Sequence, residues 1–133
     1  MISLQEGDAA RAAELATASL GLRPDHAPTR RIAADAWFAL SLQRHGARDR
    51  PGEIDALHEV LRHAPDRVEA EVNLGLALQE SGALDDAMRA YGRAYRAREA
   101  TFGRIAHAWA SADSGRLWLD LGDLRAELRA AVP

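Results

Sequence analysis

Histidines and carboxylates are the side chains of this 133-residue sequence that could support catalysis or hold a metal. His58, Glu59 and His63 superficially follow the zinc-protease pattern, in which two histidines one helical turn apart bind zinc beside a catalytic glutamate. Here the histidines are five positions apart rather than four, which places them about 140° apart around a helix. They cannot bind one ion together, so we expect both to be surface or boundary residues.

The other candidates for chemistry are scattered along the chain. The three remaining histidines are isolated in sequence, and the paired carboxylates lie where helix starts would use them. These residues are His26, His45 and His107, and Asp85, Asp86, Asp120 and Asp123. A metal site assembled from all five histidines stays open as an alternative. We predict no catalytic residue, no metal site and no cofactor.

All 17 basic residues are arginine, because the sequence contains no lysine. A phosphate-binding P-loop, a kinase-type site and a Schiff-base site all depend on a lysine amine. The sequence also contains no cysteine, which excludes disulfides, thiolate nucleophiles and cysteine-based zinc sites. These classes of chemistry are therefore excluded.

Charge and hydropathy favour a soluble protein. The net charge of -3 gives no general attraction to nucleic acid or to acidic membrane surfaces. No apolar stretch approaches the roughly 20 residues of a membrane span, and no secretion signal is recognisable at the N-terminus. We expect a cytoplasmic protein with no nucleic-acid or membrane partner.

Helical periodicity predicts an all-α fold in a single domain, since alanine and leucine dominate and β-branched residues are few. Helices are expected over 8–22, 28–45, 53–64, 67–80, 84–99 and 123–131, and the residues of 101–111 also follow helical spacing. The third helix should stop before Pro65, because the residue before a proline is pushed out of the α region. An irregular apolar segment, 116–121, is expected before the last helix.

Small and large apolar residues at fixed offsets make 67–100 resemble one unit of the tetratricopeptide repeat (TPR) family. Leu74, Gly75 and Leu78 match the first helix of the family's unit, and Ala87 and Tyr91 match the second. Gly82 and Ala94 also match. Gly75 and Ala87 should let two backbones approach closely. The resemblance implies a short right-handed superhelix of antiparallel helix pairs, a TPR-like solenoid.

The solenoid should contain units at about 7–26, 27–66 and 67–100, followed by a C-terminal capping segment, 101–133. Pro24 and Pro65 are 41 residues apart, seven more than the family period of about 34. The seven extra residues hold Arg44, His45, Arg48 and Arg50. The first unit lacks most of its first helix. The apolar stripe of this unit is therefore expected to be uncovered at the N-terminal end. It consists of Ala12, Leu15, Ala16, Ser19 and Leu20.

The resemblance implies a peptide-binding groove lined by the first helix of each pair. The residues expected there are Arg31, Asp35, Phe38, Leu42, Val72, Asn73, Leu76, Gln79 and Glu80. An asparagine in the groove can hold an extended peptide backbone, and apolar side chains flanked by polar ones suit a short peptide. The alternative is that the apolar members of this set simply pack on neighbouring helices. The lysine-containing carboxylate clamp of some family members cannot be assembled in this chain.

Arg89, Arg93 and Arg96 share one stripe of the helix predicted over 84–99. Interspersed charge on an exposed helix usually means a solvated face, which is the interpretation we favour, with Arg89 partly paired to Asp85. A contact with phosphate or with an acidic peptide is the alternative.

Together these features predict a non-catalytic adaptor or scaffold that binds a protein or peptide partner. A self-assembling module, through a homo-oligomer at the N-terminal end, is one alternative. A regulator or enzyme with a small-molecule site between helices is another.

Overall fold

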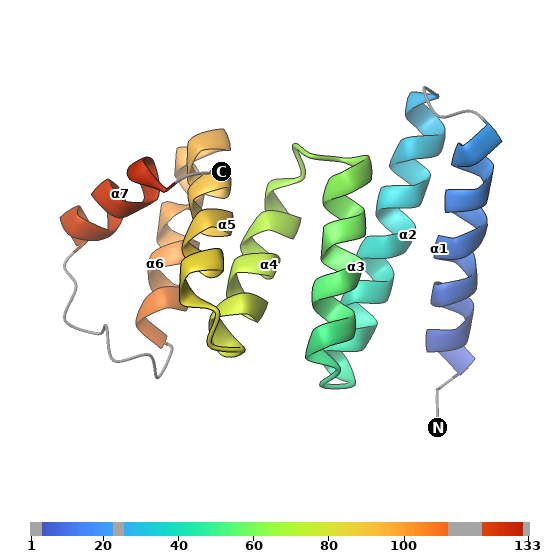
Figure 1. Ribbon diagram of the computed structural model, residues 1–133, viewed down its shortest axis with the longest axis horizontal. Coiled ribbons are helices and arrows are strands. Elements are labelled where there is room, and N and C mark those ends of the chain that lie inside the picture. The colour runs from blue at the N-terminus through green and yellow to red at the C-terminus, as the bar shows by residue number, and fades with distance from the viewer. Residues whose placement is uncertain (1–3, 23–25, 112–120, 132–133) are drawn as a thin grey trace. The chain divides into compact units, whose positions relative to one another are not determined.

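The computed structural model describes residues 4–22, 26–111 and 121–131, and every regular element in these ranges is helical (Figure 1). The α-helices are α1 (Leu4–Leu22), α2 (Ala27–Gly46), α3 (Arg50–His63), α4 (Val68–Glu80), α5 (Leu84–Ala97), α6 (Phe102–Ser111) and α7 (Leu121–Ala130). A short 3-10 helix, η1 (Glu99–Thr101), precedes α6. The predicted all-α fold is confirmed.

The helices form two compact units, which we call unit 1 (residues 1–67) and unit 2 (residues 68–133). Unit 1 contains α1 to α3, and unit 2 contains α4 to α7. The division falls where the second repeat unit was expected to end. The superhelix itself stays a prediction.

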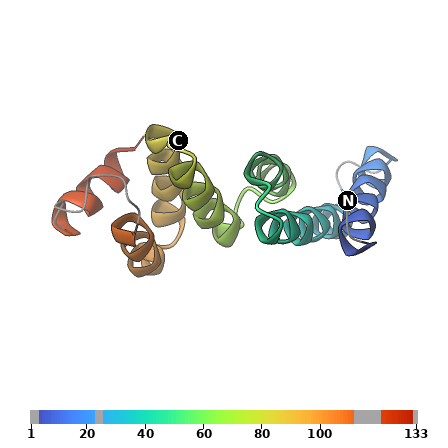
Figure 2. The same ribbon diagram turned by 90° about the horizontal axis from the view of Figure 1, so that it is seen from below.

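In unit 1, α1 and α3 both pack against α2, as two views of the ribbon show (Figures 1 and 2). On α2, Ala33 and Leu40 are buried, while Arg31, Asp35 and Leu42 are exposed. This is the division of faces that the 3.6-residue period predicts.

The buried stripe of α1 is not the expected one. The sequence suggested Ala12, Leu15, Ala16, Ser19 and Leu20, but the buried residues are Ala13, Ala16 and Leu20. Leu15 is 62% exposed, whereas Leu20 packs with Ala16 and Ala33. The prediction was right at Ala16 and Leu20 and wrong at Ala12, Leu15 and Ser19. An alanine-rich helix offers little contrast between faces, so the partner helix decides which small residues are covered.

Local signals set the ends of α3. Asp49 precedes the helix, and its carboxylate accepts a hydrogen bond from the backbone N–H of Gly52 at 3.1 Å. At the other end Ala64 is extended, with φ of -140°, directly before Pro65. The predicted stop before the proline is confirmed.

In unit 2, α4 and α5 form a tight hairpin. Gly82 turns the chain between them with φ of 89°, a left-handed conformation that glycine adopts at little cost. A Cβ placed on Gly75 would lie 2.5 Å from the ring of Tyr91, which is fully buried. Gly75 therefore lies directly against the ring of Tyr91, which fills the space that a side chain would occupy. The close approach of the two backbones stays a prediction.

The C-terminal helices complete the core of unit 2. Ile105 and Trp109 of α6, and Leu124 and Leu128 of α7, join one buried cluster with Tyr91. Arg96 of α5 donates hydrogen bonds to the carbonyl oxygens of Leu128 at 3.0 Å and Ala131 at 2.6 Å, at the end of α7. The last helix was expected over 123–131 and begins at Leu121. Of the segment expected to be irregular, 116–120 lies outside the described residues.

Candidate functional site

One face of α2 carries the four candidate binding residues of unit 1. Arg31, Asp35, Phe38 and Leu42 recur at spacings of three or four, which places them on one side of the helix. Arg31 and Asp35 are exposed, Phe38 is half-buried, and Leu42 is 51% exposed. We call these four residues the α2 face. It offers apolar contact at one end and charge at the other.

Arg67, the last residue of unit 1, contacts two members of the α2 face. Its guanidinium carbon lies 4.6 Å from the centre of the Phe38 ring, and its Nη1 lies 2.5 Å from a carboxylate oxygen of Asp35. A guanidinium over an aromatic face is attracted by the ring quadrupole. Arg67 therefore holds Phe38 and Asp35 in one arrangement, a role that no local pattern in the sequence could reveal.

The five candidate residues of α4 divide into two groups. Asn73 and Leu76 are half-buried and Glu80 is exposed, at spacings that place all three on one side of α4. Val72 and Gln79 are only 5% and 4% exposed. A ligand could reach these two side chains only by displacing the core of unit 2.

Gln79 is held by partners inside unit 2. Its amide nitrogen donates to the carbonyl oxygen of Ala108 at 3.2 Å, and its amide oxygen accepts a hydrogen bond from the Tyr91 hydroxyl at 2.7 Å. Val72 packs in the same cluster as Tyr91 and Trp109. Because α6 covers this side of α4, we leave Val72 and Gln79 out of the candidate surface and keep Asn73, Leu76 and Glu80.

Among the described residues of unit 2, Tyr91 has a strongly raised pKa. Burial raises the pKa of its hydroxyl well above the ordinary value, and the negative charge of Glu80 raises it further. Its ring meets that of Trp109 edge to face, with centroids 6.3 Å apart. The shift therefore follows from packing and from a neighbouring carboxylate.

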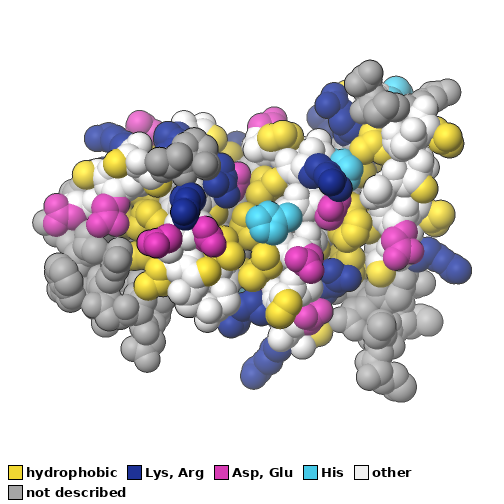
Figure 3. Space-filling view, viewed as in Figure 1, with side chains coloured by type: hydrophobic (Ala, Val, Ile, Leu, Met, Phe, Trp, Pro, Cys, Tyr) yellow, Lys and Arg dark blue, Asp and Glu magenta, His cyan; other side chains and the backbone are white. Residues whose placement is uncertain are grey.

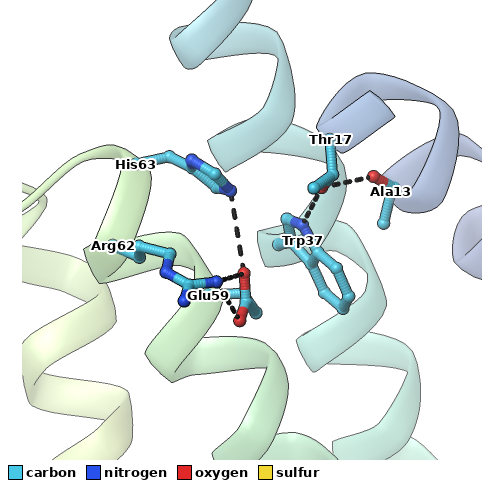
Figure 4. A network of polar contacts seen from close by, with 6 residues as sticks. All are labelled: Ala13, Thr17, Trp37, Glu59, Arg62 and His63. Atoms are coloured by element: carbon cyan, nitrogen blue, oxygen red, sulfur yellow. Dashed lines mark hydrogen bonds and ion pairs between the residues drawn. The ribbon is translucent and has the colours of Figure 1, made fainter. Parts of the chain in front are cut away.

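The histidine pair that superficially matched a zinc motif is not brought together. His58 is exposed, whereas the side chain of His63 is 8% exposed and its Nε2 lies 3.7 Å from a carboxylate oxygen of Glu59 (Figure 4). Arg62 donates to the same carboxylate at 3.1 Å. Burial lowers the pKa of His63, the Glu59 carboxylate opposes that shift, and Arg62 adds to it. Among the described residues no group of three histidine, aspartate or glutamate side chains could hold a metal.

A second polar contact in Figure 4 joins α1 to α2. The indole N–H of Trp37 donates to the hydroxyl of Thr17 at 2.9 Å, and that hydroxyl donates to the carbonyl oxygen of Ala13 at 2.9 Å. These contacts satisfy the polar atom of a half-buried tryptophan.

The arginines of α5 have partners within unit 2. Arg89 pairs with Asp86 at 3.0 Å rather than with Asp85, and Arg93 donates from Nε to the buried Glu71 at 2.9 Å. Arg96 bonds the end of α7, as described above. The stripe is partly solvated, as expected, because Arg96 is exposed and the Arg89 side chain is 43% exposed. All three arginines also have intramolecular partners.

Charged side chains of both signs are interspersed over the surface seen in Figure 3, with apolar side chains between them. Among the described helices, none combines the length and apolar character needed to cross a membrane. Comparison with protein-family models and with curated proteins finds no match to this chain.

Proposed function

We propose that this chain is a non-catalytic adaptor or scaffold that binds a protein or peptide partner, with the α2 face as the main contact. A TPR-like stack of antiparallel helix pairs is the arrangement we propose for it, on the strength of the Gly75 and Tyr91 contact between α4 and α5. The α2 face carries the proposal because it presents an exposed leucine beside a half-buried phenylalanine, with charged groups around them.

The distribution of apolar side chains supports a contact through unit 1. Among the described residues, the large hydrophobic side chains that remain exposed are Leu15, Leu22, Ile32 and Leu42, and all belong to unit 1. Apolar contacts surrounded by polar groups are typical of peptide and protein interfaces. Leu42 and Phe38 would supply the apolar contact, and Arg31 would meet an acidic or carbonyl group of the partner.

Asn73, Leu76 and Glu80 of α4 are proposed as a second, smaller contact. The Asn73 amide can both donate to and accept from the backbone of an extended peptide. The peptide-binding groove that the resemblance implies stays a prediction.

The proposed absence of catalysis is supported by the surroundings of the polar groups. The strongly perturbed hydroxyl of Tyr91 is fully buried and bonded to Gln79, so a substrate has no access to it. The buried carboxylate of Glu71 is paired with Arg93. These groups serve packing rather than chemistry.

A peptide selection on the full chain tests the proposal. Peptides selected from a random displayed library on the wild-type protein are rebound to a Leu42→Arg variant, which puts an additional charge beside Phe38 and Arg67. Affinity should fall about tenfold or more, the effect of losing an interface anchor, with helicity unchanged. Leu15→Arg is the matched control, since Leu15 is a similarly exposed leucine on α1. Peptides that ignore Leu42→Arg and are lost with Leu15→Arg would overturn the assignment to α2.

Self-assembly through α1 is the second candidate function. Leu15 and Leu22 are 62% and 86% exposed and lie seven positions apart, on one side of α1. Sedimentation equilibrium should then show mass rising with concentration, and a Leu15→Glu, Leu22→Glu double variant should be a monomer. A wild-type monomer at every concentration would exclude this candidate.

A further inference from the structure

A pocket of about 280 Å³ lies at the turn between α2 and α3, and arginines dominate its lining. The lining residues are His45, Arg48, Arg50 and Glu53. Two positively charged guanidinium groups thus line the pocket together with a single carboxylate. The lining carries a net positive charge even when His45 is neutral.

The one carboxylate in the pocket already has a partner. Glu53 is 7% exposed, and both of its carboxylate oxygens lie 3.2 Å from Nδ1 of His45. Asp49, the nearest other acidic residue in sequence, accepts the hydrogen bond from Gly52 at the start of α3. Arg44 adds a positive charge beside the turn and donates to the Gly52 carbonyl oxygen at 2.9 Å. Asp49 keeps its negative charge, because the backbone N–H that it accepts from is neutral. Three arginines, Arg44, Arg48 and Arg50, nevertheless outnumber the two carboxylates of Asp49 and Glu53, so the charge around the turn is net positive.

The turn that presents Arg48 is fixed by backbone hydrogen bonds. The N–H of Arg48 donates to the carbonyl oxygen of His45 at 3.1 Å, and that of Asp49 donates to the carbonyl oxygen of Arg44 at 2.9 Å. These bonds hold Arg48 at φ of 59°, a left-handed conformation that residues with a side chain seldom adopt. The side chain is thus presented from a defined backbone position rather than from a mobile loop.

We propose that this pocket binds an oxyanion, a phosphate or carboxylate group, with Arg48 as its ligand and with Arg50 adding positive charge to the lining. Planar guanidinium groups match the oxygen spacing of both anions and form charge-assisted hydrogen bonds with them. The volume is just below the range of about 300–1,000 Å³ that is common for small-molecule sites, so it suits one anionic group rather than a large cofactor. The site goes beyond the proposed function, because it lies at the α2–α3 turn and uses none of the α2 face.

Amide chemical shifts of the full chain test the site directly. The protein is titrated with sodium phosphate, with sodium acetate and with sodium chloride at constant ionic strength. Saturable shifts confined to 47–53 with phosphate, with acetate or with both support the site. The salt that causes them shows whether the site binds phosphate groups, carboxylate groups or both. Shifts that are absent, or that chloride reproduces, overturn it.

Two variants distinguish a specific anion-binding site from nonspecific electrostatic attraction. Arg48→Gly removes one guanidinium and supplies the residue that a positive φ prefers, so the turn should fold at least as well as in the wild type. Phosphate affinity should fall about tenfold or more with no loss of melting temperature. Arg30→Gln, which removes the same charge from an exposed position on α2, should leave affinity within about twofold. Unchanged binding in Arg48→Gly, or an equal loss in both variants, contradicts the proposal.

Discussion

The two units of this chain use their apolar residues in opposite ways. Between α1 and α2 of unit 1 the buried contacts are made mainly by alanines with Leu20 and Leu40, whereas unit 2 buries the rings of Tyr91, Tyr95, Phe102 and Trp109 in one cluster. Among the described residues, the large apolar side chains that remain exposed all belong to unit 1. Because the free energy of burial grows with apolar area, unit 2 should have the more stabilised core and unit 1 the surface available to partners.

Removing the central ring of unit 2 should have the largest effect. Tyr91→Ala would leave a cavity and deprive Gln79 of a hydrogen bond, at a cost of about 3–5 kcal/mol in the free energy of unfolding. Leu20→Ala, at the contact between α1 and α2, should cost about 2 kcal/mol, because Leu20 lies at the edge of a small cluster. Chemical denaturation of both variants measures the two losses. Equal losses would show that the units do not differ in this way.

The same glycine-to-alanine change should have opposite signs in the two units. Gly75→Ala would push a methyl group into the Tyr91 ring and destabilise the protein by about 1–3 kcal/mol. At Gly21 of α1 an added Cβ meets nothing within 4 Å, so alanine should stabilise the helix by about 0.5–1 kcal/mol. Thermal melts of the two variants test this. A stabilising Gly75→Ala would refute the tight contact between Gly75 and the Tyr91 ring.

His63 should give unit 1 a small dependence of stability on pH. Its pKa is lowered in the folded state, so between that value and the ordinary value of 6.5 the unfolded chain binds more protons. Stability is therefore fully present above about pH 6.5 and is lost as the pH falls through the lowered pKa. Denaturation midpoints from pH 7.5 to pH 5 should decline less in a His63→Gln variant than in the wild type. Parallel declines would assign the pH dependence to other groups.

Two helix boundaries, the end of α3 and the turn after α4, were predictable because their causes are local. Pro65 forces Ala64 out of the helical region, and Gly82 supplies the left-handed residue of the α4–α5 turn. Gly75 likewise predicted a tight helix contact. Its partner in that contact, Tyr91, occurs at the spacing that the repeat pattern requires. The starts of α1 and α3 were expected at 8 and 53 but lie at Leu4 and Arg50, and α5 was expected to reach 99 but ends at Ala97.

The candidate surface was only partly predictable because its limits depend on distant segments. Gln79 is covered by α6, about 30 residues later in the chain, and Phe38 is held by Arg67, 29 positions away. Periodicity places a residue on a face of its own helix but does not say which helix will cover that face. The pocket at the α2–α3 turn did have a sequence signal, the cluster of basic residues in the extended second unit, but the opposing Glu53 was not part of it.

Hydrogen exchange of the full chain, with and without a peptide selected on it, tests the central claim most directly. Binding through the α2 face predicts added protection of backbone amides across the stretch from Asp35 to Leu42, with α1 and α5 unchanged. Slower exchange reports local stabilisation by the bound partner. Protection confined to α1, or to α5 and α7, with the α2 amides exchanging at their free rates, would contradict the assignment.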